Sequence, residues 1–172
     1  MVYRITAVCT GNICRSPIAE AVVRAELSTA GITDVVVDSA GTSDWHVGEG
    51  ADPRAIAALN RVGLNLEHTV RQFDPTWMSE GHTLAPDLVL ALDHSHLLTL
   101  RNRTPTAVHG RIRLLRTYDP RLASLADADL ELEVPDPYYG SSVDFDDVLR
   151  MITDAARGLA QQWVSGSVLR LD

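Results

Sequence analysis

The chain has only two cysteines among its 172 residues, Cys9 and Cys14. Two are too few for a disulfide framework, and their scarcity favours a reducing compartment. No run of apolar residues approaches the roughly 18 that a membrane span needs. The N-terminus, Met1 to Arg4, lacks the long apolar core of a secretory signal peptide. We therefore expect a cytoplasmic protein that has no membrane partner.

Basic residues are outnumbered, since 15 of them face 23 acidic residues and the formal net charge is -8. This balance argues against nucleic acid as a partner. An anionic ligand would have to be drawn by a local positive field, because the charge of the whole protein repels it. Hydrophobic residues make up 45% of the chain and charged residues 22%, as in ordinary globular proteins. Composition and length together predict a single domain over residues 1–172.

Short buried strands alternate with helices along the chain. The first strand consists of small or branched side chains such as Ile5 and Val8. The last helix carries an apolar stripe at alternating steps of three and four residues. This alternation predicts an α/β fold, with a parallel sheet covered by helices on both faces. The predicted strands are 3–9, 35–37, 88–92 and 111–115, the predicted helices are 16–30, 52–62, 94–103 and 145–163, and residues 123–135 form an acidic loop.

The most informative segment is Cys9–Ser16, which reads Cys-Thr-Gly-Asn-Ile-Cys-Arg-Ser and lies between the first strand and the first helix. Backbone N–H groups of such a loop can surround an anion, and the positive end of the helix points at the same place. Gly11 and Asn12 tolerate the left-handed backbone that a tight loop needs. Arg15 carries a planar fork that binds two phosphate oxygens at once. The segment therefore predicts a phosphate site with a thiol at its floor.

Cys9 could attack a phosphate ester only as a thiolate, and a free thiol with a pKa of about 8.5 is mostly protonated at neutral pH. The loop amides, the helix and a hydrogen bond from the Ser16 hydroxyl would each favour the ionised form. Ser16 is also a candidate N-cap, because Pro17 suits the first helical position. The alternative interpretation of Cys9 is a small buried apolar residue at a strand end.

Cys14 has two interpretations that the sequence leaves open. It could form a disulfide with Cys9 and shield the nucleophile from deeper oxidation. It could equally be a structural thiol that lines the loop. A dithiol redox centre is disfavoured, because four residues separate the two cysteines instead of the usual two.

A proton donor is also expected, because a phenolate of pKa about 10 is expelled slowly unless an acid protonates it. The chain has four Asp-Pro pairs, so the pair alone identifies nothing. Asp136 differs in lying between Pro135 and Pro137, which stiffen the backbone. Tyr138 and Tyr139 follow, and they could wall a slot for a flat ring. The segment can fold over the strand ends, where open α/β sheets bind ligands. The alternative is a simple turn before the last helix.

His94-Ser95-His96 has residue types that occur in metal sites, since imidazole is a common zinc ligand. The motif follows a predicted strand and opens a predicted helix. Helix capping and surface exposure are therefore the favoured interpretation, and we predict no metal.

Together these segments resemble the low-molecular-weight protein tyrosine phosphatases. The loop matches the family pattern Cys-x-Gly-Asn-x-Cys-Arg-Ser, and Asp136–Gly140 matches the family's acid loop. Two distant motifs in the right order are far more specific than either alone. The resemblance runs from about residue 3 to the last helix and includes Asp38–Thr42, Trp45 and Asp52–Ala55.

The resemblance implies four parallel strands in the order 2-1-3-4 and a two-step hydrolysis of phosphotyrosine that needs no metal or cofactor. Cys9 would form a phosphocysteine and Arg15 would hold the equatorial oxygens. Asp136 would protonate the leaving phenolate and then act as base for water. The implied partners are tyrosine-phosphorylated proteins and a tyrosine kinase that acts on Tyr138 and Tyr139. Phosphate would be bound by the loop residues Thr10, Gly11, Asn12, Ile13, Cys14 and Ser16. The loop would be fixed by Asn12, Ser39 and His68. The rim of the site would consist of Trp45, His46, Tyr138 and Tyr139.

Two other functions compete with this prediction. Thiol-coupled arsenate reduction on the same fold uses two further redox cysteines in a later segment, and this chain has no cysteine after Cys14. A non-catalytic phosphate-binding module would need neither the thiol of Cys9 nor the acid of Asp136. Both alternatives are therefore disfavoured.

Overall fold

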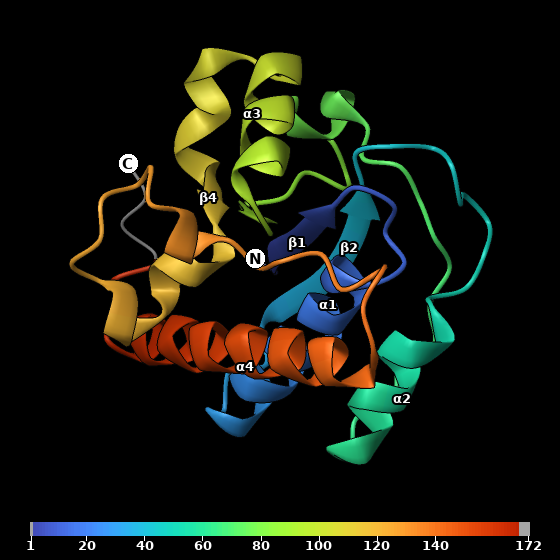
Figure 1. Ribbon diagram of the computed structural model, residues 1–172. Coiled ribbons are helices and arrows are strands. Elements are labelled where there is room, and N and C mark those ends of the chain that lie inside the picture. The colour runs from blue at the N-terminus through green and yellow to red at the C-terminus, as the bar shows by residue number, and fades with distance from the viewer. Residues whose placement is uncertain (1, 169–172) are drawn as a thin grey trace.

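The computed structural model describes residues 2–168 and shows strands that alternate with helices (Figure 1). The strands are β1 (Tyr3–Cys9), β2 (Val35–Gly41), β3 (Leu88–Ala91) and β4 (Ile112–Leu114). The main helices are α1 (Arg15–Thr29), α2 (Pro53–Arg61), α3 (His94–Arg103) and α4 (Ser142–Val164). All eight elements lie where the sequence predicts them, and β2 extends four residues further than expected, to Gly41.

The strands form one parallel sheet in the order β2-β1-β3-β4, which confirms the predicted fold. Ile5 of β1 lies opposite Val37 of β2 on one side and Leu88 of β3 on the other. The chain therefore moves to one side of β1 to form β2 and to the other side to form β3. The crevice at the carboxyl end of such a central strand is where open α/β sheets bind ligands.

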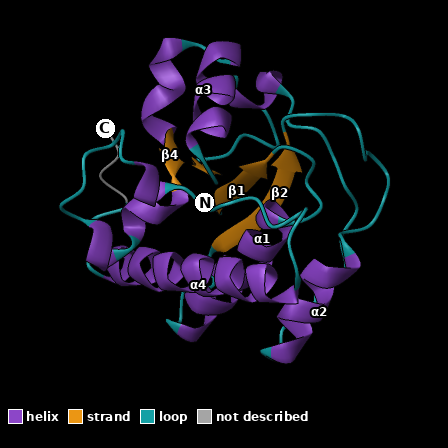
Figure 2. Cartoon of the chain, in the orientation of Figure 1, coloured by secondary structure: helices purple, strands orange, loops and turns teal. Residues whose placement is uncertain are grey.

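Each face of the sheet carries its own hydrophobic cluster. Side chains alternate along a strand, so Ile5 and Leu88 belong to the cluster that includes residues of α1, α2 and α4. Val8 and Val89 belong to the cluster that includes residues of α3. Figure 2 shows the strands between α3 on one side and the other three helices on the opposite side. Burial on both faces explains why β3 contains no polar position.

The helix α4 confirms the predicted apolar stripe. It starts with a capping box, in which the Ser141 N–H donates to Asp144 Oδ2 at 2.6 Å. Near its end, Trp163 packs edge to face on Tyr3, with ring centroids 4.7 Å apart. Among residues 2–168, no helix is both long enough and apolar enough to cross a bilayer. The buried stripe comprises Phe145, Val148, Ile152, Ala155 and Leu159.

The start of α1 differs from the prediction, because Ser16 is not its N-cap. Cys14 occupies that position, and no side chain caps the helix. Ser16 is instead fully buried inside the first turn, where its hydroxyl contacts the sulfur of Cys9. The first N–H groups of α1 thus have no side-chain cap and remain directed at the loop before the helix. Residues 123–135 form a loop as predicted, apart from a 3-10 turn at Leu130–Leu132.

Gly158 lies where α4 crosses the segment that follows β4. A Cβ atom at this position would lie 1.8 Å from the carbonyl oxygen of Tyr118. Alanine is ordinarily favoured over glycine inside a helix by about 1 kcal/mol, but here the contact is with backbone that cannot move aside. We expect Gly158→Ala to lower the free energy of unfolding by about 3 kcal/mol through overpacking. Urea denaturation followed by circular dichroism measures this difference.

Gly110→Ala is the matched control, since a Cβ atom at Gly110 meets nothing within 4 Å. This variant is expected to change the free energy of unfolding by less than about 0.5 kcal/mol. If Gly158→Ala proves as stable as the parent protein, the Tyr118 carbonyl oxygen does not lie within 1.8 Å of the position of a Cβ atom at Gly158.

Candidate active site

The loop of residues 9–16 is held from behind by the side chain of Asn12. Asn12 is fully buried and has a φ of 56°, in the left-handed region that asparagine tolerates better than most residues. Its amide nitrogen donates to Ser16 Oγ at 2.8 Å and to Ser39 Oγ at 3.0 Å. Its amide oxygen accepts the Arg71 N–H at 3.1 Å. Three hydrogen bonds from one side chain thus fix the loop conformation.

Glu20 and His68 extend this network. Ser39 Oγ donates to Glu20 Oε2 at 2.7 Å, and His68 Nε2 donates to the Asn12 carbonyl oxygen at 2.8 Å. Burial by itself raises the pKa of Glu20. The nearby His68 imidazole, the hydrogen bond from Ser39 and the charge of Arg24 outweigh burial and lower the pKa. Glu20 is therefore a largely buried anion. The sequence analysis missed it, whereas Ser39 and His68 lie next to Asn12 as the resemblance implies.

The sulfur of Cys9 lies 3.0 Å from Ser16 Oγ. Because Ser16 Oγ already accepts an N–H from Asn12, its own hydroxyl hydrogen is free to point at the sulfur. The other acceptor within reach, the Ala40 carbonyl oxygen, is more distant at 3.4 Å. A hydroxyl donor at this distance can stabilise negative charge on the sulfur when the sulfur attacks or leaves phosphorus.

Gly41, at the end of β2, allows the sheet to approach the loop. A Cβ atom at Gly41 would lie 2.6 Å from the Thr10 carbonyl oxygen. That same oxygen accepts hydrogen bonds from the N–H and the hydroxyl of Ser43, both at 3.0 Å. A glycine is therefore needed where β2 passes the backbone of Thr10.

Arg15 is buried and joins three segments of the chain. Its Nη1 donates to Asp93 Oδ2 at 2.7 Å and to the Val134 carbonyl oxygen at 3.0 Å. Its Nη2 lies 3.5 Å from Asp136 Oδ2. Burial by itself raises the pKa of Asp93, but the neighbouring imidazole of His96, hydrogen bonds at the start of α3 and Arg15 outweigh burial and lower the pKa. Asp93 is thus an anionic partner for Arg15, and the sequence analysis did not identify it.

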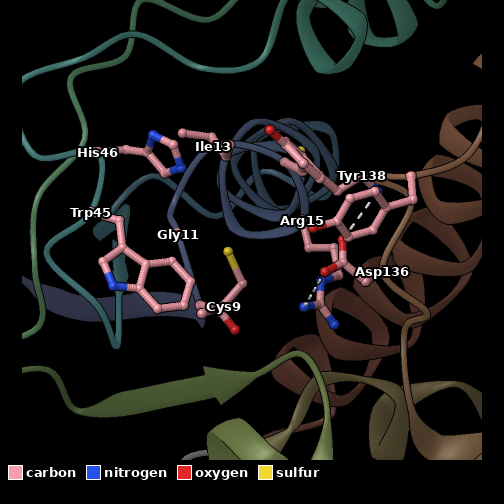
Figure 3. Close-up of a pocket in the computed structure, with 11 residues that line it drawn as sticks. Cys9, Gly11, Ile13, Arg15, Trp45, His46, Asp136 and Tyr138 are labelled. Atoms are coloured by element: carbon pink, nitrogen blue, oxygen red, sulfur yellow. Dashed lines mark hydrogen bonds and ion pairs between the residues drawn. The ribbon is translucent and has the colours of Figure 1, made fainter.

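A cavity of about 370 Å³ opens above Cys9. Figure 3 shows Trp45 and His46 on one side of the Cys9 sulfur, with Asp136 and Tyr138 on the other. Cys9 is 3% exposed at the floor, whereas Trp45 at the rim is 73% exposed. The lining residues are Cys9, Thr10, Gly11, Ile13, Cys14, Arg15, Trp45, His46, Asp136, Tyr138 and Tyr139.

Four residues that the sequence assigned to the site do not line the cavity. They lie behind the loop, so any contact of Asn12 or Ser16 with a ligand would come from the backbone. These residues are Asn12, Ser16, Ser39 and His68.

Asp136 combines fixed geometry with access to solvent. Its side chain is 53% exposed, and its Oδ1 accepts the Tyr138 N–H at 3.1 Å. The Tyr138 ring is held by the guanidinium of Arg54, 5.5 Å from the ring centroid. Tyr139 packs edge to face on Tyr138 with ring centroids 5.0 Å apart. The carboxyl therefore lies at the mouth of the cavity, beside an aromatic wall.

Cys14 lines the same cavity, and both cysteines are free thiols. Burial raises the pKa of Cys14 well above its usual range, and the neighbouring acidic groups, Asp52 first, raise it further. Cys14 is therefore protonated at neutral pH and is a poor nucleophile. A thiol that lines the loop is the form present in this structure.

The prediction that His94 and His96 are surface residues is wrong for His96, which is 1% exposed. Its Nε2 lies 2.8 Å from Thr10 Oγ1. His94 is partly exposed, and its Nδ1 contacts Glu133 Oε1 at 2.8 Å, in the segment that leads to Asp136. Both histidines thus connect α3 to segments that line the cavity.

Comparison with known proteins gives consistent matches over nearly the whole chain. Residues 4–167 match a family described as low molecular weight phosphotyrosine protein phosphatase. A relative from Streptomyces coelicolor, named low molecular weight protein-tyrosine-phosphatase, is 50% identical over 161 residues, which cover 92% of each chain.

Solved structures agree with this match. A protein tyrosine phosphatase from Entamoeba histolytica, with Hepes in its active site, has a TM-score of 0.82 and 28% identity, covering 95% of this chain and 98% of its own. The arginine phosphatase YwlE of Bacillus subtilis, in a variant with a phosphorylated active-site serine, has a TM-score of 0.78 and 29% identity. That alignment covers 98% of this chain and 99% of YwlE.

Proposed function

We propose that this chain, which belongs to the low molecular weight phosphotyrosine protein phosphatase family, hydrolyses phosphotyrosine through a phosphocysteine at Cys9. One observation carries the proposal, namely that a nearly buried thiol, a guanidinium and a carboxyl share one cavity, from Cys9, Arg15 and Asp136. A site that only bound phosphate would need no thiol, and a carboxylate at its mouth would repel the ligand. The arrangement fits bond cleavage better than binding alone.

In the first step, the Cys9 thiolate attacks phosphorus, a P–S bond forms and the P–O bond to the tyrosine ring breaks. Arg15 and the loop N–H groups bind the equatorial oxygens, where negative charge gathers in the transition state. Asp136 gives its proton to the leaving phenolate oxygen. The ion pair between Arg15 and Asp93 fixes the guanidinium before substrate arrives.

In the second step, water attacks phosphorus, the P–S bond breaks and the Cys9 thiolate leaves. The attacking water takes the place that the phenolate left, so the same Asp136 carboxylate can accept its proton. The Ser16 hydroxyl, 3.0 Å from the sulfur, stabilises the departing thiolate as it does the attacking one. The phosphorylated active-site serine in the YwlE variant supports a phosphoenzyme on this fold.

The walls of the cavity favour a flat aromatic ester. Ile13, Trp45 and Tyr138 present apolar surface between the floor and the mouth, where a tyrosine ring can pack. We propose tyrosine-phosphorylated proteins as substrates. A tyrosine kinase is a further proposed partner, because Tyr138 is 40% exposed and Tyr139 is 95% exposed. Two free cysteines fit a reducing, cytoplasmic compartment.

Arsenate reduction by a cysteine relay is not favoured, because the sequence contains no cysteine besides Cys9 and Cys14. Cys14 is held protonated beside Asp52, so it is a poor candidate for the second member of such a relay.

A panel of substrates tests the proposed function. We expect the protein to hydrolyse p-nitrophenyl phosphate equally well with and without EDTA. Among peptides that carry phosphotyrosine, phosphoserine, phosphohistidine or phosphoarginine, we expect kcat/KM for phosphotyrosine to be higher by about 100-fold or more. A preference for phosphoarginine peptides would mean that phosphoarginine, and not phosphotyrosine, is the substrate. Loss of activity in EDTA would contradict the metal-free mechanism.

A further inference from the structure

His96 is a buried titratable side chain that the proposed reaction does not use. It belongs to the first turn of α3 and is 1% exposed. It contacts a residue that is 86 positions away in the sequence, in the loop after β1. An imidazole is costly to bury unless its nitrogen atoms have polar neighbours. Its neighbours therefore indicate its role.

The ring lies between the two ends of the loop. His96 Nε2 is 2.8 Å from Thr10 Oγ1, next to the nucleophile. His96 Nδ1 is 3.0 Å from Asp93 Oδ1. The other oxygen of Asp93 accepts Arg15 Nη1 at 2.7 Å. One imidazole thus links Thr10, at the start of the loop, to the carboxylate that holds Arg15 at its end.

The position of the ring proton follows from these neighbours. Burial lowers the pKa of His96 to about 4, so the ring is neutral at pH 7 and has one N–H. Asp93 is anionic and only accepts hydrogen bonds, which favours the proton on Nδ1. The Nδ1 contact is too bent to be a hydrogen bond, so its attraction to Asp93 is electrostatic. Nε2 is then the acceptor, and the Thr10 hydroxyl donates to it.

We propose that His96 is a positioning residue, which holds the Thr10 side chain, and with it the start of the loop, in the geometry that phosphoryl transfer needs. The inference rests on the proposed function of the loop and adds a residue from α3 to it. Without His96, the Thr10 hydroxyl is free to rotate and the N–H groups of the loop are held less firmly. Because these groups act most on the transition state, the loss should appear in kcat more than in KM.

Two substitutions of His96 by an amide side chain distinguish a positioning role from a role in packing alone. The amide of His96→Gln can reach the position of Nε2, whereas the shorter amide of His96→Asn ends near Nδ1. We expect His96→Asn to lower kcat for phosphotyrosine by about 10-fold or more, as the loss of one oriented buried hydrogen bond does. We expect His96→Gln to stay within about 3-fold of the parent. Equal losses in the two variants would show a packing role and overturn the proposal.

Thr10→Val tests the same contact from the other side, in case the His96 variants fold poorly. Valine has the shape of threonine without the hydroxyl, and Thr10 is only partly buried. We expect a loss in kcat similar to that of His96→Asn. Because both changes break one contact, the double variant should lose little more than either single variant. An unchanged kcat in Thr10→Val, or losses that multiply in the double variant, would overturn the proposal.

Vanadate binding, measured by isothermal titration calorimetry, gives a result that does not depend on turnover. We expect His96→Asn to weaken vanadate binding by about 10-fold and His96→Gln to retain it. If vanadate binding depends on His96 in a protein that does not hydrolyse phosphotyrosine, the proposed function fails and the inference stands. If His96→Asn keeps full kcat and full vanadate affinity, the inference fails and the proposed function stands.

Discussion

Cys9→Ser is expected to abolish turnover, lowering kcat by at least about 10⁴-fold. A serine hydroxyl stays protonated at neutral pH and is a far weaker nucleophile than a thiolate. The groups that bind the oxyanion remain, because Arg15 keeps its ion pair with Asp93. We therefore expect the variant to bind inorganic phosphate and vanadate. Steady-state turnover of p-nitrophenyl phosphate and calorimetry with phosphate measure the two properties.

Cys14→Ser is the matched control, since it makes the same change at the other cysteine of the cavity. Burial and Asp52 keep Cys14 protonated, so the loss of its sulfur should lower kcat by less than about 10-fold. Similar losses in the two variants would mean that Cys9 has no special role. Loss of phosphate binding in Cys9→Ser would point to a damaged loop instead of a missing nucleophile.

The second large expected effect concerns the protonation of the leaving phenolate by Asp136. Asp136→Asn keeps the shape of the side chain and the oxygen that accepts the Tyr138 N–H, but it cannot donate an acidic proton. We expect kcat/KM for phosphotyrosine to fall by about 100- to 1000-fold. For p-nitrophenyl phosphate we expect a fall of less than about 10-fold, because nitrophenolate leaves without help. The parameter kcat/KM reports the first step, so a role of Asp136 in the second step does not affect this comparison.

Asp74→Asn is the control for Asp136→Asn, because Asp74 is also followed by a proline. Its carboxylate accepts the Thr76 N–H at 2.9 Å, in an exposed turn that does not line the cavity. Activity within about 2-fold of the parent is expected for both substrates. Equal losses on phosphotyrosine and p-nitrophenyl phosphate in Asp136→Asn would remove Asp136 from the role of acid.

The sequence predicts those parts of the fold and of the site whose residues lie close together in the chain. The strand, loop and helix around Cys9 follow one another within about 20 residues, and their spacing alone indicates an anion site. The alternation of strands and helices likewise indicates a parallel sheet. Asp136 is recognisable because prolines flank it, and family resemblance supplies the strand order.

The residues that the sequence analysis missed act through contacts between distant segments. Asp93 meets Arg15 across 78 positions, and His96 meets Thr10 across 86. Such pairs depend on β3 lying next to β1, which periodicity does not show. Two of the missed residues, Asp93 and Glu20, nevertheless stand out in the sequence. Asp93 directly follows a strand at the carboxyl edge of a parallel sheet, and Glu20 is a single acid in the apolar run Ile18–Val23.

Ser16 shows a different limit of local rules. A serine before a proline at a helix start is typical of an N-cap, and that prediction was wrong. The N-cap is Cys14, two residues earlier, and the Ser16 hydroxyl is turned toward Cys9 and Asn12. The N–H groups that a cap would bind are instead directed at the loop, where an anion can bind them.

The central claim is that Cys9 is the nucleophile, and identifying the atom that carries phosphate during turnover tests it most directly. During turnover of p-nitrophenyl phosphate, Asp136→Asn should complete the first step, because nitrophenolate leaves unaided, and should stall at the second, because no base activates water. Acid quenching followed by mass spectrometry of the peptides identifies the residue that carries phosphate. The account predicts phosphate on the sulfur of Cys9. Phosphate on any other residue, or a burst of nitrophenolate that leaves Cys9 unmodified, would contradict it.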